Sequence, residues 1–145
     1  MATSTAGSNK ISILDKLIAI LDEISDFTGN VYGGYRPESA VKADKHILVH
    51  LVEDRYVGGS LDEDEHSIQF NVLVKYRAGT KGDPKEQMDT FIDTVGLVED
   101  KLKANYNVPG VWEDLRINRI NYTFGQSRGF NYYSGMITLT IRTQW

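Results

Sequence analysis

The sequence predicts an α+β domain in which two helices pack on one face of a mostly antiparallel sheet. Two segments, at about residues 10–26 and 84–103, have apolar residues at helical spacing. Five other segments are strand-like, in the order helix, strand, strand, strand, helix, strand, strand. Strands that follow one another, with helices interspersed, are typical of an α+β fold. The 145 residues are enough for one domain with its own core.

The first predicted helix covers about residues 10–26. Leu14, Leu17, Ile18 and Leu21 recur on one face, and charged residues lie between them. We assign residues 10–145 to a single domain. Residues 1–9 are small and polar, and we expect them to be flexible and to lack the features of a signal peptide.

Three strands are expected before the second helix. The stretch "VYGGY" fits a short edge strand with a bend at its paired glycines, and Pro37 ends it. Residues 45–57 and 66–77 alternate between apolar and polar, most clearly in the second of the two. Because residues 58–65 between them contain a Gly-Gly pair, we expect an antiparallel hairpin.

The second helix and the last two strands have clear local features. Asp83 is placed to be the N-cap, Pro84 fits the first helical position, and Glu86 fits the third. Residues 111–125 and 130–145 are the last strands. The apolar phase changes between Ile117 and Ile120, and this predicts a β-bulge.

The acidic stretch of residues 60–67, "SLDEDEHS", poses the question of a metal site. Calcium loops place ligands at alternate positions around a central glycine, whereas these acids are contiguous. We therefore expect a solvated hairpin loop, with His66 as a loop residue, whose charge serves in assembly or faces a lumen. The candidate loop residues are Asp62, Glu63, Asp64 and Glu65.

Enzymatic chemistry is not expected, and neither are a metal nor a cofactor. The chain has no cysteine, which excludes a thiolate zinc site. His46 and His50 share a strand face, but they lie roughly 13 Å apart at about 3.3 Å per residue, too far to hold one ion. The net charge of −4 disfavours general nucleic-acid binding.

The last two strands carry arginines interleaved with tyrosines. Such a face can bind RNA, but the RNP motif is absent, and Arg and Tyr are also enriched at protein–protein interfaces. We expect Trp145 to be held against another surface. The candidate interface residues are Arg116, Arg119, Tyr132, Tyr133, Arg142 and Trp145.

Over about residues 10–145 the chain resembles the tail terminator (tail-completion, minor tail) proteins of long-tailed bacteriophages. The resemblance is carried by "ILDKLIAILDEI", "VYGGYRPESA", "HILVHLVEDR", "HSIQFNVLVKYRAG" and "PKEQMDTFIDTVGLVEDKL", followed by two closing strands. It rests on the order and length of these elements and on the turn beginning "VYGG".

The resemblance implies a virion structural protein with no catalytic residue. Such proteins form a hexameric ring on the last ring of the tail tube, stop its polymerisation, and present a surface to the head–neck connector or stopper protein. DNA only passes through the lumen, and no membrane is involved. The implied location is the tail–neck junction of the virion, with assembly in the host cytoplasm.

Two alternatives remain open from the sequence. One is another ring protein of the neck or tail. The other is a small ligand-binding α+β domain whose pocket would be lined by Tyr35, His50, Tyr76 and Trp112.

Overall fold

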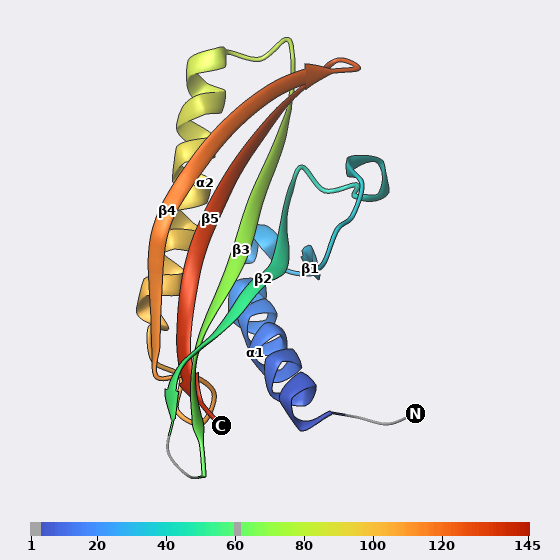
Figure 1. The fold of residues 1–145 in the computed structure, drawn as a ribbon. Coiled ribbons are helices and arrows are strands. Elements are labelled where there is room, and N and C mark those ends of the chain that lie inside the picture. Colours follow the sequence, from blue (N-terminus) through green and yellow to red (C-terminus); the bar gives the residue numbers. More distant parts are fainter. Residues whose placement is uncertain (1–3, 60–61) are drawn as a thin grey trace.

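The computed structural model describes residues 4–59 and 62–145. Their elements are α1 (Thr5–Asp22), the 3-10 helix η1 (Ser25–Phe27), β1 (Val31–Gly33), the 3-10 helix η2 (Glu38–Ala40), β2 (Lys45–Gly59), β3 (Asp64–Gly79), α2 (Pro84–Ala104), β4 (Asp114–Ser127) and β5 (Phe130–Gln144). The five strands form one sheet in the order β1-β2-β3-β5-β4 (Figure 1). Only β1 and β2 are parallel. The predicted fold class is confirmed.

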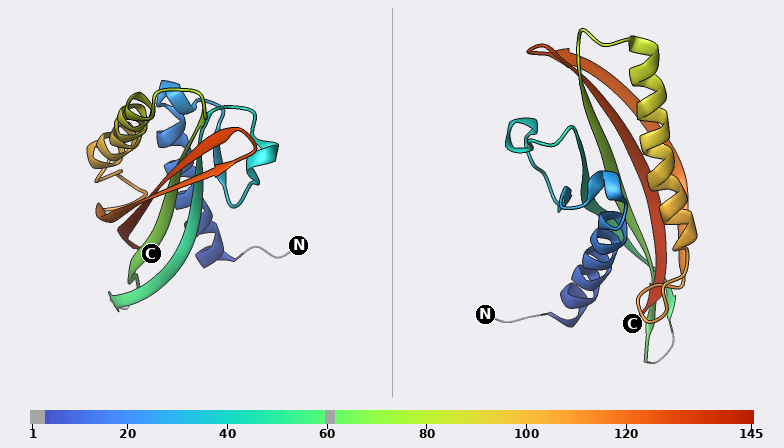
Figure 2. Two further views of the ribbon diagram at one scale, coloured as in Figure 1. Left: turned by 90° about the horizontal axis from the view of Figure 1, so that it is seen from above. Right: turned by 180° about the vertical axis from the view of Figure 1, so that it is seen from behind.

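The core lies between the sheet and the two helices, which cover the same face (Figure 2). Alternate residues of β3 and β5 point into it, so that Ile68, Phe70 and Ile137 are fully buried. Leu17 of α1 and Phe91 of α2 pack onto them. Burial of each such side chain contributes about 1.5–3 kcal/mol, so these two strands and two helices hold the fold together.

Both helices begin at side-chain caps. The Asp83 carboxylate accepts a hydrogen bond from the Lys85 amide at 3.1 Å, and Pro84 follows, as predicted. α1 begins at Thr5 rather than at about residue 10, because the Ser4 hydroxyl caps it through the Gly7 amide at 3.1 Å. Part of the segment expected to be flexible is therefore helical, while residues 1–3 lie outside the described residues.

Bulges determine which side chains of the outer strands face the helices. The predicted bulge in β4 is confirmed by a register shift between Ile117 and Arg119. A second bulge, which the sequence did not predict, lies between Leu51 and Glu53 of β2. Beyond it, Asp54 is level with the buried Ile68, so a charged residue is turned toward the helix side.

The segment between β1 and β2 crosses onto the helix-free face of the sheet. Arg77 on that face donates to the Lys42 carbonyl at 2.9 Å, and Glu38 pairs with Lys75 at 3.7 Å. His46, predicted to be half-exposed, is instead buried beside this segment. Burial lowers its pKa, and the nearby Lys75 and Arg77 add to this effect against the opposing charge of Glu38.

The closest approach of α2 to the sheet is at Gly135 of β5. A Cβ placed there would lie 2.9 Å from Cγ2 of Val95. We expect Gly135→Val to lower the free energy of unfolding by about 1–3 kcal/mol through overpacking, as measured by urea titration. Gly125→Val is the matched control, because no heavy atom lies within 4 Å of its Cβ position. Equal effects of the two changes would contradict this packing.

Candidate functional site

The acidic segment is only partly a loop. Asp62 and Glu63 are exposed and precede β3, whereas Asp64 and Glu65 belong to the strand. The Asp64 amide donates to the Trp145 carbonyl at 2.7 Å, and the Trp145 amide donates back at 3.1 Å. Glu65 pairs with Arg142 of β5. The acids therefore lie at the free end of the β2–β3 hairpin, next to the last residue of the chain.

His66 is not a loop residue, as the sequence had indicated, but a core residue. Its side chain is fully buried, and Nδ1 lies 2.9 Å from Oδ1 of Asp54, not near an acid of the loop. The Trp145 ring stacks on the imidazole with centroids 3.6 Å apart, and the edge of Tyr56 approaches to 4.4 Å. The prediction that Trp145 is held against another surface is met within the chain itself.

Asp54 joins this cluster to the N-terminal helix. Its Oδ2 lies 2.8 Å from Nζ of Lys10 on α1. Burial opposes ionisation of Asp54, but hydrogen bonds from Lys10 and His66 outweigh it, so the pKa of the carboxyl lies below its usual value. An Asp–His pair also occurs in hydrolases. Here the imidazole is closed off from solvent, and the pair serves to tie α1, β2, β3 and the C-terminal residue together.

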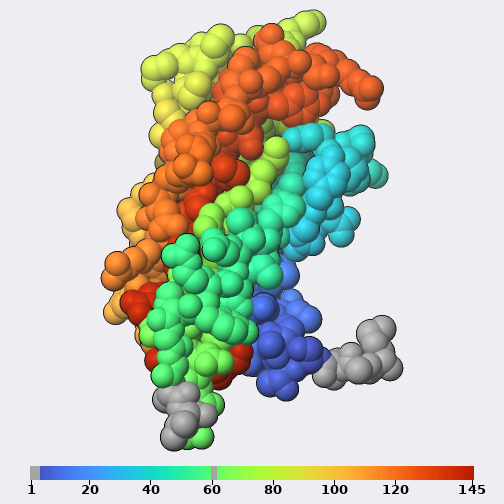
Figure 3. Space-filling view, viewed as in Figure 1, coloured from blue at the N-terminus to red at the C-terminus, as the bar shows by residue number. Residues whose placement is uncertain are grey.

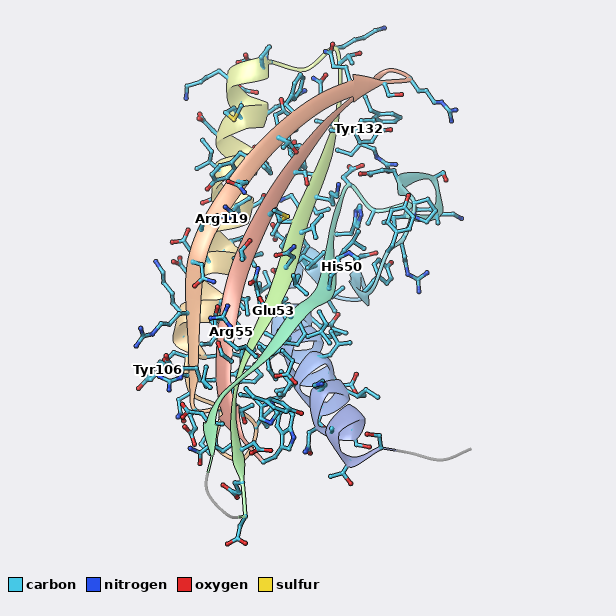
Figure 4. The ribbon with its side chains drawn as sticks, viewed as in Figure 1. His50, Glu53, Arg55, Tyr106, Arg119 and Tyr132 are labelled. Atoms are coloured by element: carbon cyan, nitrogen blue, oxygen red, sulfur yellow. The ribbon has the colours of Figure 1, made fainter. Side chains whose placement is uncertain are left out.

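The predicted interface residues fall into two groups. Arg116, Arg119, Tyr132 and Arg142 lie on the helix-free face of β4 and β5, and the three arginines are exposed. Figure 4 shows Arg119 and Tyr132 on these strands. Tyr133 is on the opposite side, only 4% exposed, and its hydroxyl donates to Oε1 of Gln87 at 3.1 Å. With Trp145 stacked on His66, four of the six candidates share one face.

The residues suggested for a ligand pocket do not come together. Tyr35 is 76% exposed after β1, His50 is on the helix-free face, and Tyr76 stacks on Tyr133. Only Trp112 lines a cavity, of about 360 Å³, which it shares with Trp145. Among residues 4–59 and 62–145, no three metal-ligating side chains are grouped, and no helix is long and apolar enough to span a membrane.

An uncovered apolar groove runs between α2 and β4. Tyr122 and Phe124 face the helix side of the sheet but remain 55% and 57% exposed, because α2 does not extend over them. With Met88 and Ile92 of α2 they line a groove of about 430 Å³, floored by Phe91 and Tyr133. The sequence predicted the facing of the two β4 aromatics but contained no signal that they would be uncovered.

Two long strand edges are open on opposite sides of the sheet. β4 is the last strand on one side. On the other side β1 pairs only with Ile47–Val49, so within the described residues 50–59 of β2 pair with β3 alone. We call residues 50–59 the β2 edge and residues 114–127 the β4 edge; both lie at the surface (Figure 3). The β2 edge exposes Leu51, Val52, Tyr56 and Val57.

Comparison with known proteins gives little beyond the fold. No family model matches the chain, and no curated protein matches it. Among solved structures it is similar to a chain from the virion of a native gene transfer agent particle, with a TM-score of 0.48 and 14% identity over 88% of this chain and 84% of that chain. A second solved structure, without a descriptive name, has a TM-score of 0.42 and 10% identity over 97% and 98%. At these low values, the function is proposed from the geometry of the chain itself.

The Asp54 cluster predicts a defined acid sensitivity. Since the folded-state pKa of Asp54 is lowered, its carboxylate stabilises the fold above about pH 4, and this contribution is lost as the pH falls through the folded-state pKa. Asp54→Asn should lower the free energy of unfolding at pH 7 by about 1–3 kcal/mol. It should also flatten the decline of stability below about pH 5. Urea titrations across this range would measure both effects.

The control for this experiment is Asp62→Asn, which removes an exposed acid from the hairpin end. It should leave both the stability at pH 7 and its decline in acid unchanged. If Asp54→Asn declines in acid as steeply as the parent protein, the role assigned to the carboxylate is wrong.

Proposed function

We propose that this chain is a structural protein of a phage-like virion and, more particularly, a tail terminator whose copies form a ring on the end of the tail tube. The observation that carries the proposal is the pair of open edges on opposite sides of one sheet. Long, uncovered strand edges are ready to pair with another chain. A subunit whose two contact surfaces differ assembles head to tail, and such contacts close into a ring when the rotation between copies permits it.

The exposed apolar residues support assembly over a free monomeric existence. Leu51, Val52, Tyr56 and Val57 are each about half or more exposed on the β2 edge, and Tyr122 and Phe124 are so beside the β4 edge. Contiguous apolar patches of this kind mark protein–protein contacts. The α2–β4 groove offers a further apolar surface, suited to the tail-tube protein below the ring or the head–neck protein above it.

The function proposed is geometric rather than catalytic. The ring would cap the tube, stop its polymerisation and join it to the neck. Asp62, Glu63 and Asp64 at the hairpin end give each copy a negative tip, and such tips facing a lumen would repel the phosphates of passing DNA. The buried Asp54–His66 pair would keep the hairpin and the last residue in place for this purpose.

A second candidate function rests on the cavity beside Trp112. Its volume of about 360 Å³ is sufficient for a small ligand. A thermal-shift screen with metabolites would favour this function if one of them raised the melting temperature. Another ring protein of the neck or tail would use the same open edges, and only the position at which it binds would distinguish it.

Negative-stain electron microscopy of the protein, alone and mixed with tail-tube protein from the same source, tests the proposal. We expect rings on the tube ends and tubes that stop growing once the protein is added, because the ring blocks the surface on which the next tube subunit docks. Tubes without the protein are the control. Unaffected tubes with bare ends would sink the terminator assignment.

A further inference from the structure

We propose that the β2 edge of one copy pairs antiparallel with the β4 edge of the next copy, with Glu53 opposite Arg116 and Arg55 opposite Asp114. This inference rests on the proposed function, since it names the contact between neighbouring copies in the ring. The occupant of each edge is therefore a second copy of this chain. Strand direction, register and charge each support the pairing.

Strand direction favours it first. β2 is antiparallel to β3, β3 to β5, and β5 to β4, so β2 and β4 run in opposite directions. A neighbour that continues the sheet without being turned over presents its β2 edge antiparallel to β4. Antiparallel pairing is the slightly more stable arrangement per residue.

Register follows from following the ladders across one copy. Glu53 is level with Arg116 through Gln69 and Thr140. Arg55 is level with Asp114 through Ser67 and Arg142. In a ring whose sheet continues without a step in register, residues at one level meet across the contact.

A single antiparallel register satisfies both of these pairs. Moving two residues forward along β2, from Glu53 to Arg55, corresponds to moving two residues back along β4, from Arg116 to Asp114. Opposite charges directly across two strands are stabilising, and like charges there are destabilising. Any shift of one or two residues would lose one or both attractions.

All four charged side chains lie on the helix-free face, and Figure 4 shows where Glu53 and Arg55 lie on β2. Within one copy each pairs with a neighbour on its own strand. Arg55 Nη2 lies 3.7 Å from Glu53 Oε1, and Arg116 Nε lies 2.8 Å from Asp114 Oδ2. Since these pairs are exposed to water, they are weak, and their partners can be exchanged at little cost.

The helix side of the same contact is apolar. Leu51 is level with Ile117 through Phe70 and Leu139, because the bulge at Val52 shifts the register there. Leu51 is 47% exposed in the single copy. The proposed contact thus covers an exposed leucine on one side of the ladder and pairs opposite charges on the other.

Disulfide cross-linking tests the register, since the chain has no cysteine of its own. The test protein carries Arg55→Cys and Asp114→Cys. Within one copy these positions lie on opposite edges with β3 and β5 between them, roughly 14 Å apart at about 4.8 Å per strand. They are beyond the reach of a disulfide, which requires Cα atoms within about 7 Å. Any disulfide between them therefore joins two copies.

Oxidation of the concentrated protein, alone and on tail tubes, should give a ladder of covalent multimers on a non-reducing gel. The control combines Arg55→Cys with Arg119→Cys, which is exposed on the same face but out of register. We expect the in-register pair to cross-link at least about ten times faster, because the control positions exceed disulfide distance. Equal rates, or equally fast dimers of Arg55→Cys alone, would overturn the proposed pairing.

The two proposals fail in different ways. Rings seen by microscopy without cross-linking of the in-register pair would refute this contact and leave the terminator assignment standing. A ladder specific to the in-register pair, with tubes that keep growing, would support the contact and refute the assignment. Neither rings nor cross-links would refute both.

A charge exchange provides an independent test of the Glu53–Arg116 pair. Glu53→Arg and Arg116→Glu, made singly, should each reduce ring formation by placing like charges opposite one another. The double change restores opposite charges in every contact and should restore rings to near the parent level. Circular dichroism checks that each protein is folded. A folded double variant that forms no more rings than either single variant would contradict the register.

Discussion

The alternation of β3 and β5 is the constraint on which the rest of the structure depends. Each strand points one set of residues, among them Phe70 and Leu139, into the core and the other set away from it. A slip of one residue would reverse every side chain. Because the two central strands share one apolar face, both helices must lie there, and the opposite face and the outer edges are left for other contacts.

Local patterns predicted the fold well because they depend only on neighbouring residues. The α+β class, the cap at Asp83 and the bulge after Ile117 all follow from spacing along a few residues. The lateral order of the strands was not accessible, since alternation is the same wherever a strand lies in a sheet. The bulge at Val52 was also missed, and with it the inward turn of Asp54.

The candidate surface residues show the same division. Tyr133 shares its phase with Ile137, which was already predicted to face inward, so its burial could have been inferred. The partnership of His66 with Asp54 depends on the missed bulge and on a strand pairing 12 residues apart in sequence. The exposure of Tyr122 depends on how far α2 extends sideways over the sheet, which no pattern in β4 encodes.

The place of β5 in the sheet bears on how the protein is made. β5 follows all the other elements in sequence, yet it lies between β3 and β4 and pairs with both. During synthesis the earlier strands emerge before the one that must separate and join them. Until then β3 lacks one neighbour and β4 has none. A chain still on the ribosome therefore has no completed β4 edge to offer a neighbouring copy, so the order of synthesis itself delays association until the subunit is whole.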